Sequence, residues 1–159
     1  MLFRSRGIDG CSIPTYAIPL RALALAFARF GTGKGWHPDR AAAAVRIRAA
    51  VAENPFMVAG TKRFDTEVMR AFGARAFTKT GAEGVYCAAL PELGLGVAVK
   101  CDDGAGRAAE VAMGAAIARL LPLSEAERAA LAARFQPVLR NWNGEAGGVV
   151  RAAGEDGGE

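Results

Sequence analysis

The fold is decided by residues 74–101, which read ARAFTKTGAEGVYCAALPELGLGVAVKC. Three runs rich in apolar residues, 74–80, 85–90 and 95–101, are separated by two short connections that contain glycine. The last run places Leu95, Val97, Val99 and Cys101 at alternate positions, which is typical of a half-buried strand. The four-residue connection 91–94 contains proline and glycine, so it predicts an antiparallel hairpin between the second and third strands.

Helical patterns flank these strands on both sides. The predicted helices are 20–30, 40–52, 67–72, 107–121 and 124–135. We expect Asp39 to cap the second helix and Asp65 or Thr66 to cap the third, because short polar side chains accept free amide protons at helix starts. Ser124 with Glu127 forms a capping box at the last helix. The fold class is therefore α+β, with an antiparallel sheet flanked by helices, and three strands make a small sheet for 159 residues.

The domain organisation is simple. A chain of 159 residues with 52% hydrophobic residues is expected to form one domain over residues 1–151. Residues 1–19 contain two prolines and little periodicity, so they are expected to be irregular. Residues 152–159 are glycine-rich and acidic, and we expect a disordered tail there.

Charge and cysteine content narrow the function classes. The net charge is only +4, and the densest basic group, Arg40, Arg46 and Arg48, has no interleaved aromatic residues. A solvated helix face is favoured there over nucleic-acid binding. The sequence contains no run of eighteen apolar residues, so no membrane span is predicted. The first ten residues lack the apolar segment of a secretion signal. Three widely spaced cysteines favour reduced thiols in a cytoplasm over a disulfide framework.

The most specific local motif is Lys79-Thr80-Gly81, at the predicted end of a strand. In serine acyl-transferring enzymes of the β-lactamase and penicillin-binding class, K-T-G belongs to the strand beside the nucleophile. The lysine supplies positive charge, and the glycine allows substrate to approach the backbone. The simpler alternative is a solvated lysine that precedes a glycine turn.

A nucleophile for that chemistry is missing from the sequence. No serine, threonine or cysteine is followed by lysine three residues later, as a Ser-x-x-Lys motif requires. The only histidine, His37, is in a loop rich in glycine and proline, where a surface role is favoured over catalysis. The chain therefore contains half of an acyl-transfer site.

Asp9-Gly10-Cys11 is the second notable segment. A cysteine in irregular backbone beside an aspartate can be a metal ligand, a reactive thiol or a packed small residue, and spacing alone favours packing. Cys87 and Cys101 fall in predicted strands and are interpreted as core residues.

Three ordered blocks carry a resemblance to a known family: GIDGCSIPTYAIPL, ENPFMVAGTKRFDTEVM and FTKTGAEGVYCAALPELGLGVAVKCDDGAGRAA. Between residues 7 and 151 the chain resembles the asparaginase II family, whose members have a serine-β-lactamase-like fold. The resemblance implies hydrolysis of L-asparagine to L-aspartate and ammonia through an acyl-enzyme.

The resemblance also implies roles for single residues. Lys79 would face the catalytic serine, and Thr80, Gly81 and Glu83 would line the substrate. Cys11 matches a cysteine that helps to bind zinc near the substrate, and Asp9 stands beside it as a supporting residue.

The chain departs from the family pattern in length. Family members are about twice as long, and their Ser-x-x-Lys helix and remaining zinc ligands precede the segment matched here. We therefore expect this chain to correspond to the C-terminal part of the enzyme and to be inactive alone, with exposed apolar surface. The expected partners are L-asparagine in the complete enzyme, and a second copy or a complementing N-terminal half. Two alternatives stay open: a non-catalytic interaction or regulatory module, and a fragment of another β-lactamase-like amidase.

Overall fold

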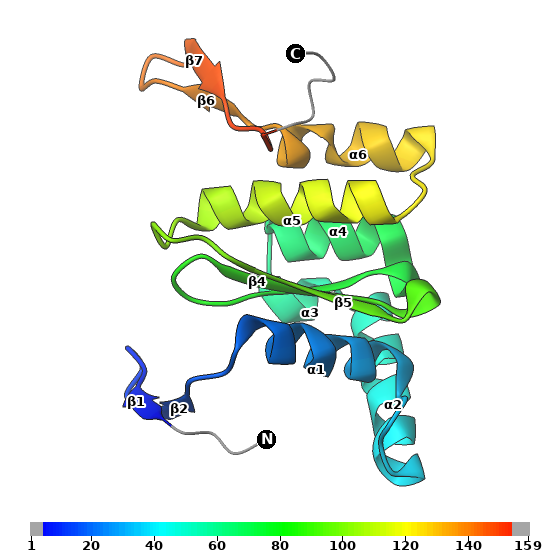
Figure 1. The fold of residues 1–159 in the computed structure, drawn as a ribbon. Coiled ribbons are helices and arrows are strands. Elements are labelled where there is room, and N and C mark those ends of the chain that lie inside the picture. Colours follow the sequence, from blue (N-terminus) through cyan, green and yellow to red (C-terminus); the bar gives the residue numbers. More distant parts are fainter. Residues whose placement is uncertain (1–4, 154–159) are drawn as a thin grey trace.

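The centre of the molecule is a three-stranded antiparallel sheet. In this computed structural model, which describes residues 5–153, the strands are β3 (Phe77–Thr80), β4 (Val85–Leu90) and β5 (Leu95–Lys100), in the order β3-β4-β5 (Figure 1). Thr80 lies opposite Tyr86, and Tyr86 lies opposite Val99. The predicted hairpin 85–101 and the α+β class are confirmed.

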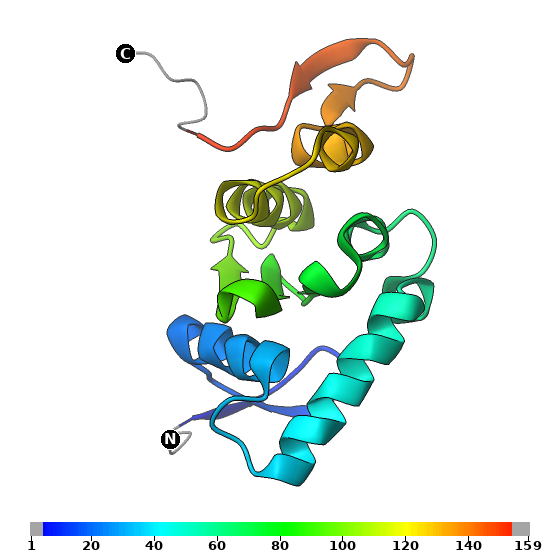
Figure 2. The same ribbon diagram turned by 90° about the vertical axis from the view of Figure 1, so that its right-hand side faces the viewer.

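Helices cover both faces of this sheet (Figures 1 and 2). Helix α1 (Leu20–Thr32) packs on one face against β4 and β5. Helix α5 (Gly106–Leu120) packs on the other face, as predicted from its apolar composition. Helices α4 (Phe64–Phe72) and α6 (Glu125–Phe135) contact each other beside α5, and α4 also contacts β3.

The main core lies between the sheet and helices α4, α5 and α6. Its largest fully buried members are Tyr86, Phe64, Leu90, Met113 and Ile117. Val97, Val99 and Cys101 pack against it, so the predicted alternation of the last strand is confirmed at these three positions. Leu95, the fourth predicted member, is exposed. On the opposite face, the Phe77 ring stacks on Phe27 of α1 with a centroid distance of 6.0 Å. It also packs at a tilt against Phe30, with a centroid distance of 5.2 Å.

Helices α2 (Pro38–Glu53) and α3 (Phe56–Ala59) connect α1 to α4. The predicted cap at Asp39 is wrong: Asp39 lies within the first turn of α2, where it pairs with His37, and His37 is the cap residue. Pro38 begins the helix because its fixed φ suits the first helical position. Asn54 ends α2 before Pro55, as predicted.

Two further hairpins were not predicted. β1 (Arg6–Ile8) pairs with β2 (Pro14–Tyr16), and β6 (Val138–Arg140) pairs with β7 (Ala146–Val149). The expectation of irregular backbone over residues 1–19 is therefore wrong for 6–8 and 14–16. Both hairpins expose apolar side chains, including Ile8, Ile13 and Trp142, in line with the expected exposure of apolar surface. The predicted tail lies largely outside the described residues, which end at 153.

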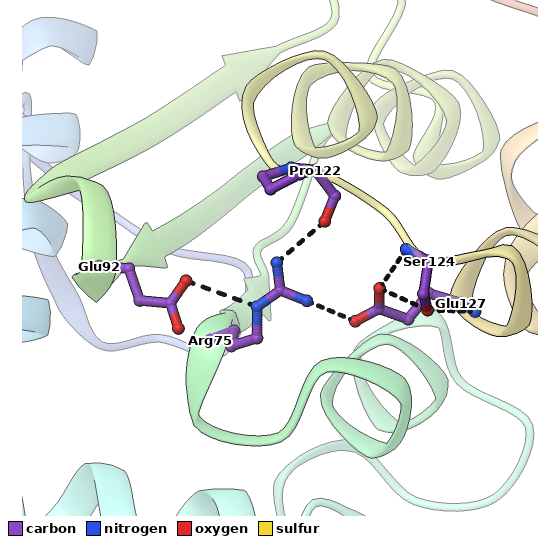
Figure 3. Close-up of polar contacts among 5 residues, drawn as sticks. All are labelled: Arg75, Glu92, Pro122, Ser124 and Glu127. Carbon is purple, nitrogen blue, oxygen red and sulfur yellow. Dashed lines mark hydrogen bonds and ion pairs between the residues drawn. The ribbon is translucent and has the colours of Figure 1, made fainter.

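The first strand of the sheet is shorter than predicted. Residues Gly73–Arg75 form the 3₁₀ turn η1, and β3 begins only at Phe77. The Arg75 guanidinium holds this turn in place (Figure 3). It donates to Glu127 Oε1 at 2.6 Å and to the Pro122 carbonyl oxygen at 3.0 Å, and it pairs with Glu92 at 3.5 Å. The entry to β3 is thereby tied to α6 and to the connection between β4 and β5.

The capping predictions for the other helices had mixed outcomes. The box of Ser124 and Glu127 at α6 is confirmed. The cap predicted at Asp65 or Thr66 is wrong, because α4 begins at Phe64 and both residues are buried in its first turn. No helix in residues 5–153 combines the length and apolar character needed to cross a membrane.

Candidate functional site

The K-T-G segment lies at the end of β3, which is an edge strand of the sheet. Lys79 is two residues from Phe77, so both side chains lie on the face that α1 covers, but Lys79 is exposed. The Gly81 N–H donates to the Val85 carbonyl at 2.8 Å and closes the turn to β4. The motif therefore has the edge-strand position that the sequence predicted.

The ammonium group of Lys79 is folded back onto its own strand. Lys79 Nζ donates to the Thr80 carbonyl oxygen at 2.8 Å, and the Thr80 hydroxyl donates to the Gly81 carbonyl oxygen at 3.3 Å. Because the lysine side chain is long and exposed, it can exchange this bond for a ligand without a change in the sheet.

The turn after Gly81 has constrained backbone. Glu83 has a φ of 53°, in the left-handed region, and Gly84 follows with a φ of 69°. A Cβ on Gly84 would lie 3.0 Å from both the Cys101 Cβ and the Gly104 carbonyl carbon. The Cys101 N–H also donates to the Gly84 carbonyl at 3.0 Å. Glu83 is thus presented to solvent on a turn that packs closely against residues 101–104.

Asp65 lies beside the motif instead of at the helix cap that the sequence predicted. Asp65 is fully buried in α4, and its Oδ2 accepts a hydrogen bond from the Thr80 N–H at 3.2 Å. Tyr86 lies opposite Thr80, and burial first, then the Asp65 charge, raises the pKa of Tyr86 well above its ordinary value. An aspartate near a helix start reads as a cap in sequence, and no local signal distinguishes that role from this contact fifteen residues along the chain.

Asp9 and Cys11 lie in the turn of the β1–β2 hairpin. Asp9 Oδ1 accepts the Gly10 N–H at 2.7 Å, and Cys11 Sγ lies 3.6 Å from Asp9 Oδ2. Both residues are exposed. Within residues 5–153, no group of three histidine, cysteine or acidic side chains is close enough to hold a metal ion.

The candidate residues fall into two groups. Lys79, Thr80, Gly81 and Glu83 share one turn, and Asp9 and Cys11 share another, with no hydrogen bond between the groups in the described part of the chain. Both turns lie toward the same end of the sheet (Figure 1). The structure therefore assembles each group separately.

None of the three serines is part of a serine–lysine pair of the Ser-x-x-Lys type. Ser12 lies in the β1–β2 turn with a φ of 67°, Ser124 caps α6, and Ser5 precedes β1. None of the three has a lysine three residues later in the sequence. His37 is paired with Asp39 at the start of α2, 3.4 Å away. Within residues 5–153, the site thus offers a lysine and a carboxylate without an activated nucleophile.

Comparison with known protein families identifies a match. The model of the L-asparaginase II family matches residues 4–152, which is most of the chain. None of the curated proteins compared with the chain matches it.

Proposed function

Because the chain belongs to the L-asparaginase II family, we propose that it provides the lysine strand of a site that hydrolyses L-asparagine. An asparaginase-like function at the family level follows from that membership. The finer assignment, to L-aspartate and ammonia as products, rests on the K-T-G segment at the end of the edge strand β3. That placement is the observation that carries the proposal.

Lys79 supplies the positive charge of the proposed site. Its ammonium group is exposed and makes a single exchangeable bond to the Thr80 carbonyl. An ammonium in this position stabilises either the substrate carboxylate or the deprotonated form of a serine hydroxyl. Lys79 is therefore the residue of this chain that we assign to catalysis.

The turn after Lys79 forms the substrate contacts in this proposal. Gly81 has no side chain, so a small substrate can approach the backbone. Thr80 offers a half-buried hydroxyl, and Glu83 offers an exposed carboxylate that can pair with the α-ammonium group of an amino acid. Lys79 and Glu83 together match the two charges of a free amino-acid amide, and Thr80 adds a neutral hydrogen-bonding group.

The nucleophile comes from outside these 159 residues in the proposed reaction. A serine Oγ attacks the side-chain amide carbonyl of asparagine, the C–N bond breaks, and ammonia leaves with a proton from the lysine that activated the serine. Water then hydrolyses the aspartyl ester and releases L-aspartate. Since the sequence lacks a Ser-x-x-Lys motif, we propose that the chain alone is inactive and that a complementing N-terminal half supplies the serine.

Zinc fits these residues poorly when they are considered alone. Cys11 and Asp9 provide two neighbouring donors, whereas protein zinc sites use three or four protein ligands. No step of the reaction is assigned to a metal here, and zinc binding at Cys11 needs further ligands.

All three cysteines are free thiols, which supports the proposal of a reducing, cytoplasmic location.

Ammonia release from L-asparagine tests the proposal. The chain is assayed alone and with a polypeptide that carries the Ser-x-x-Lys segment of a longer family member. We expect release only from the mixture, and a loss of about 10²-fold or more in Lys79→Ala. Lys34→Ala, a change at an exposed loop lysine, is the matched control and should keep the rate. Two folded partners that associate and release no ammonia would contradict the proposal and favour a non-catalytic module.

A further inference from the structure

Asp65 is an unusual residue in the core. Its side chain is fully buried in the first turn of α4. Its Oδ2 accepts the Thr80 N–H at 3.2 Å, and the Tyr86 hydroxyl also interacts with the same carboxyl group. Oδ1 is buried with no donor in hydrogen-bonding geometry among the described residues. Burying a carboxyl group that is half satisfied costs stability, so an apolar side chain would serve a purely structural purpose better.

The Thr80 amide that Asp65 binds points away from the sheet. Gly81 bonds to Val85 of β4 through its own N–H, and successive N–H groups along a strand point to opposite sides. The Thr80 N–H therefore projects from the free edge of β3, where α4 packs beside the strand. Asp65 pairs an edge amide that the sheet itself leaves unpaired.

Thr80 also accepts a hydrogen bond from the candidate catalytic lysine, Lys79. The Thr80 carbonyl, on the outward side of the strand, accepts the Lys79 ammonium at 2.8 Å, while its N–H is held by Asp65. The position of the Lys79 ammonium therefore depends on how firmly the Thr80 backbone is fixed. A hydrogen bond to a carboxyl group is one of the stronger ways to fix an amide.

We propose that Asp65 is the positioning residue of this site: it fixes the Thr80 backbone and so sets the resting position of the Lys79 ammonium before a ligand binds. The consequence for turnover rests on the proposed function, but the positioning itself does not. Thr66, the neighbouring residue, is equally buried, but its hydroxyl donates to the Gly60 carbonyl at 2.7 Å. A substitution of Thr66 therefore serves as the control for a purely structural effect in the same turn.

A second lysine, Lys100, makes the same type of contact as Lys79 and can serve as its reference. Lys100, at the end of β5, donates to the carbonyl of the residue that follows it, Cys101, at 2.6 Å. The Cys101 N–H is held by the Gly84 carbonyl rather than by a carboxyl group. Lys100 thus repeats the arrangement of Lys79 without a buried acid.

Competitive acetylation of the full chain tests the proposal. The protein is treated with trace acetic anhydride, and the ratio of Lys79 to Lys100 modification is measured by mass spectrometry. We expect Asp65→Ala to raise this ratio at least about threefold, because the Thr80 backbone gains local freedom. Asp65→Asn, which keeps an acceptor oxygen, should restore most of the original ratio, and Thr66→Val should leave it unchanged. An unchanged ratio in Asp65→Ala, or an equal rise in Thr66→Val, would overturn the proposal.

Amide exchange of the unsubstituted protein gives a second readout that does not depend on the fold of a variant. The Thr80 amide should exchange at least about tenfold more slowly than the Ala82 amide in the adjacent turn. Equal rates would show that Asp65 does not hold Thr80. Neither measurement uses asparagine, so failure of the asparaginase proposal would leave these results standing, and the reverse also holds.

Discussion

The backbone of Gly96 in β5 lies directly against Ala24 of α1, so close that a Cβ on Gly96 would stand 2.0 Å from the Ala24 carbonyl oxygen. It would also lie 2.5 Å from the Ala28 backbone nitrogen. Both obstacles are backbone atoms and cannot rotate away. The close approach of α1 to the sheet therefore depends on glycine at this position.

Gly96→Ala should consequently separate α1 from β5. We expect a loss of at least about 2 kcal/mol in the free energy of unfolding, because a side chain forced into a close-packed interface displaces whole elements. Urea denaturation measures this loss. Gly106→Ala is the control: it lies in α5 with nothing within 4 Å of the added Cβ, so stability should stay equal or rise. A Gly96→Ala protein as stable as the parent would refute this packing.

The half-buried Arg75 side chain should contribute measurably to stability. Its guanidinium contacts Glu127, Glu92 and the Pro122 carbonyl, and its Cζ lies 5.8 Å from the Phe72 ring centroid. Arg75→Met keeps the apolar stem but loses three polar contacts, so the Tm should fall by about 3–6 °C. Arg75→Lys should recover only part of this, because one ammonium cannot reproduce the planar fork.

Calorimetry of both variants beside Arg46→Met provides the comparison. Arg46 is exposed on α2, and its replacement should leave the Tm within about 1 °C. If Arg75→Met has the same Tm as Arg46→Met, the contacts in Figure 3 contribute nothing to stability.

Thiol labelling should distinguish the three cysteines. Cys11 is exposed, Cys101 is half-buried and Cys87 is buried in β4. Burial raises the pKa of the Cys87 thiol to about 11, so at pH 8 this thiol is both protonated and shielded. A maleimide should therefore modify Cys11 first and Cys87 only in denaturant, as peptide mass mapping would show. Cys11→Ser should remove the fastest phase, and rapid labelling of Cys87 in the native protein would contradict the structure.

The sequence predicted the sheet better than the ends of the chain. The boundaries of β4 were correct and those of β5 were wrong by one residue, because alternation and the proline-glycine connection act locally. The hairpins β1–β2 and β6–β7 have strands of only three or four exposed residues, which leave no hydrophobic period to detect. The segment Asn141 to Gly144 contained turn residues that could have indicated the second hairpin.

The candidate site could be predicted only where its signal was local. Lys79, Thr80 and Gly81 form a contiguous motif, and their position at a strand end was confirmed. Asp65 depends instead on a tertiary contact with Thr80, so the sequence placed it among helix caps. The β3 start was misplaced for a similar reason, since Arg75 holds residues 73–75 in a 3₁₀ turn through contacts with distant segments.

The pair of Glu67 and Arg134 should make stability depend on acid pH. Arg134 binds both Glu67 oxygens and the Lys62 carbonyl and so joins α6 to α4. This hydrogen bonding lowers the pKa of Glu67 below its ordinary value. A carboxyl whose pKa is lowered by folding stabilises the protein above its unfolded pKa, and this contribution is lost as the pH falls through the folded pKa. Glu67→Gln should therefore cost about 0.5–1 kcal/mol near neutral pH, since both groups are partly exposed and water screens them.

Denaturation series from neutral pH down to about pH 3 check this sign. The difference between the parent and Glu67→Gln should shrink as the pH falls and disappear once Glu67 is protonated in both states. Glu110 provides the opposite case, because burial raises its pKa and its protonated form is favoured by folding. The stability of Glu110→Gln relative to that of the parent should therefore increase as the pH rises through the folded pKa of Glu110. A Glu67→Gln deficit that stays constant across the series would mean that the carboxylate charge is not what joins α6 to α4.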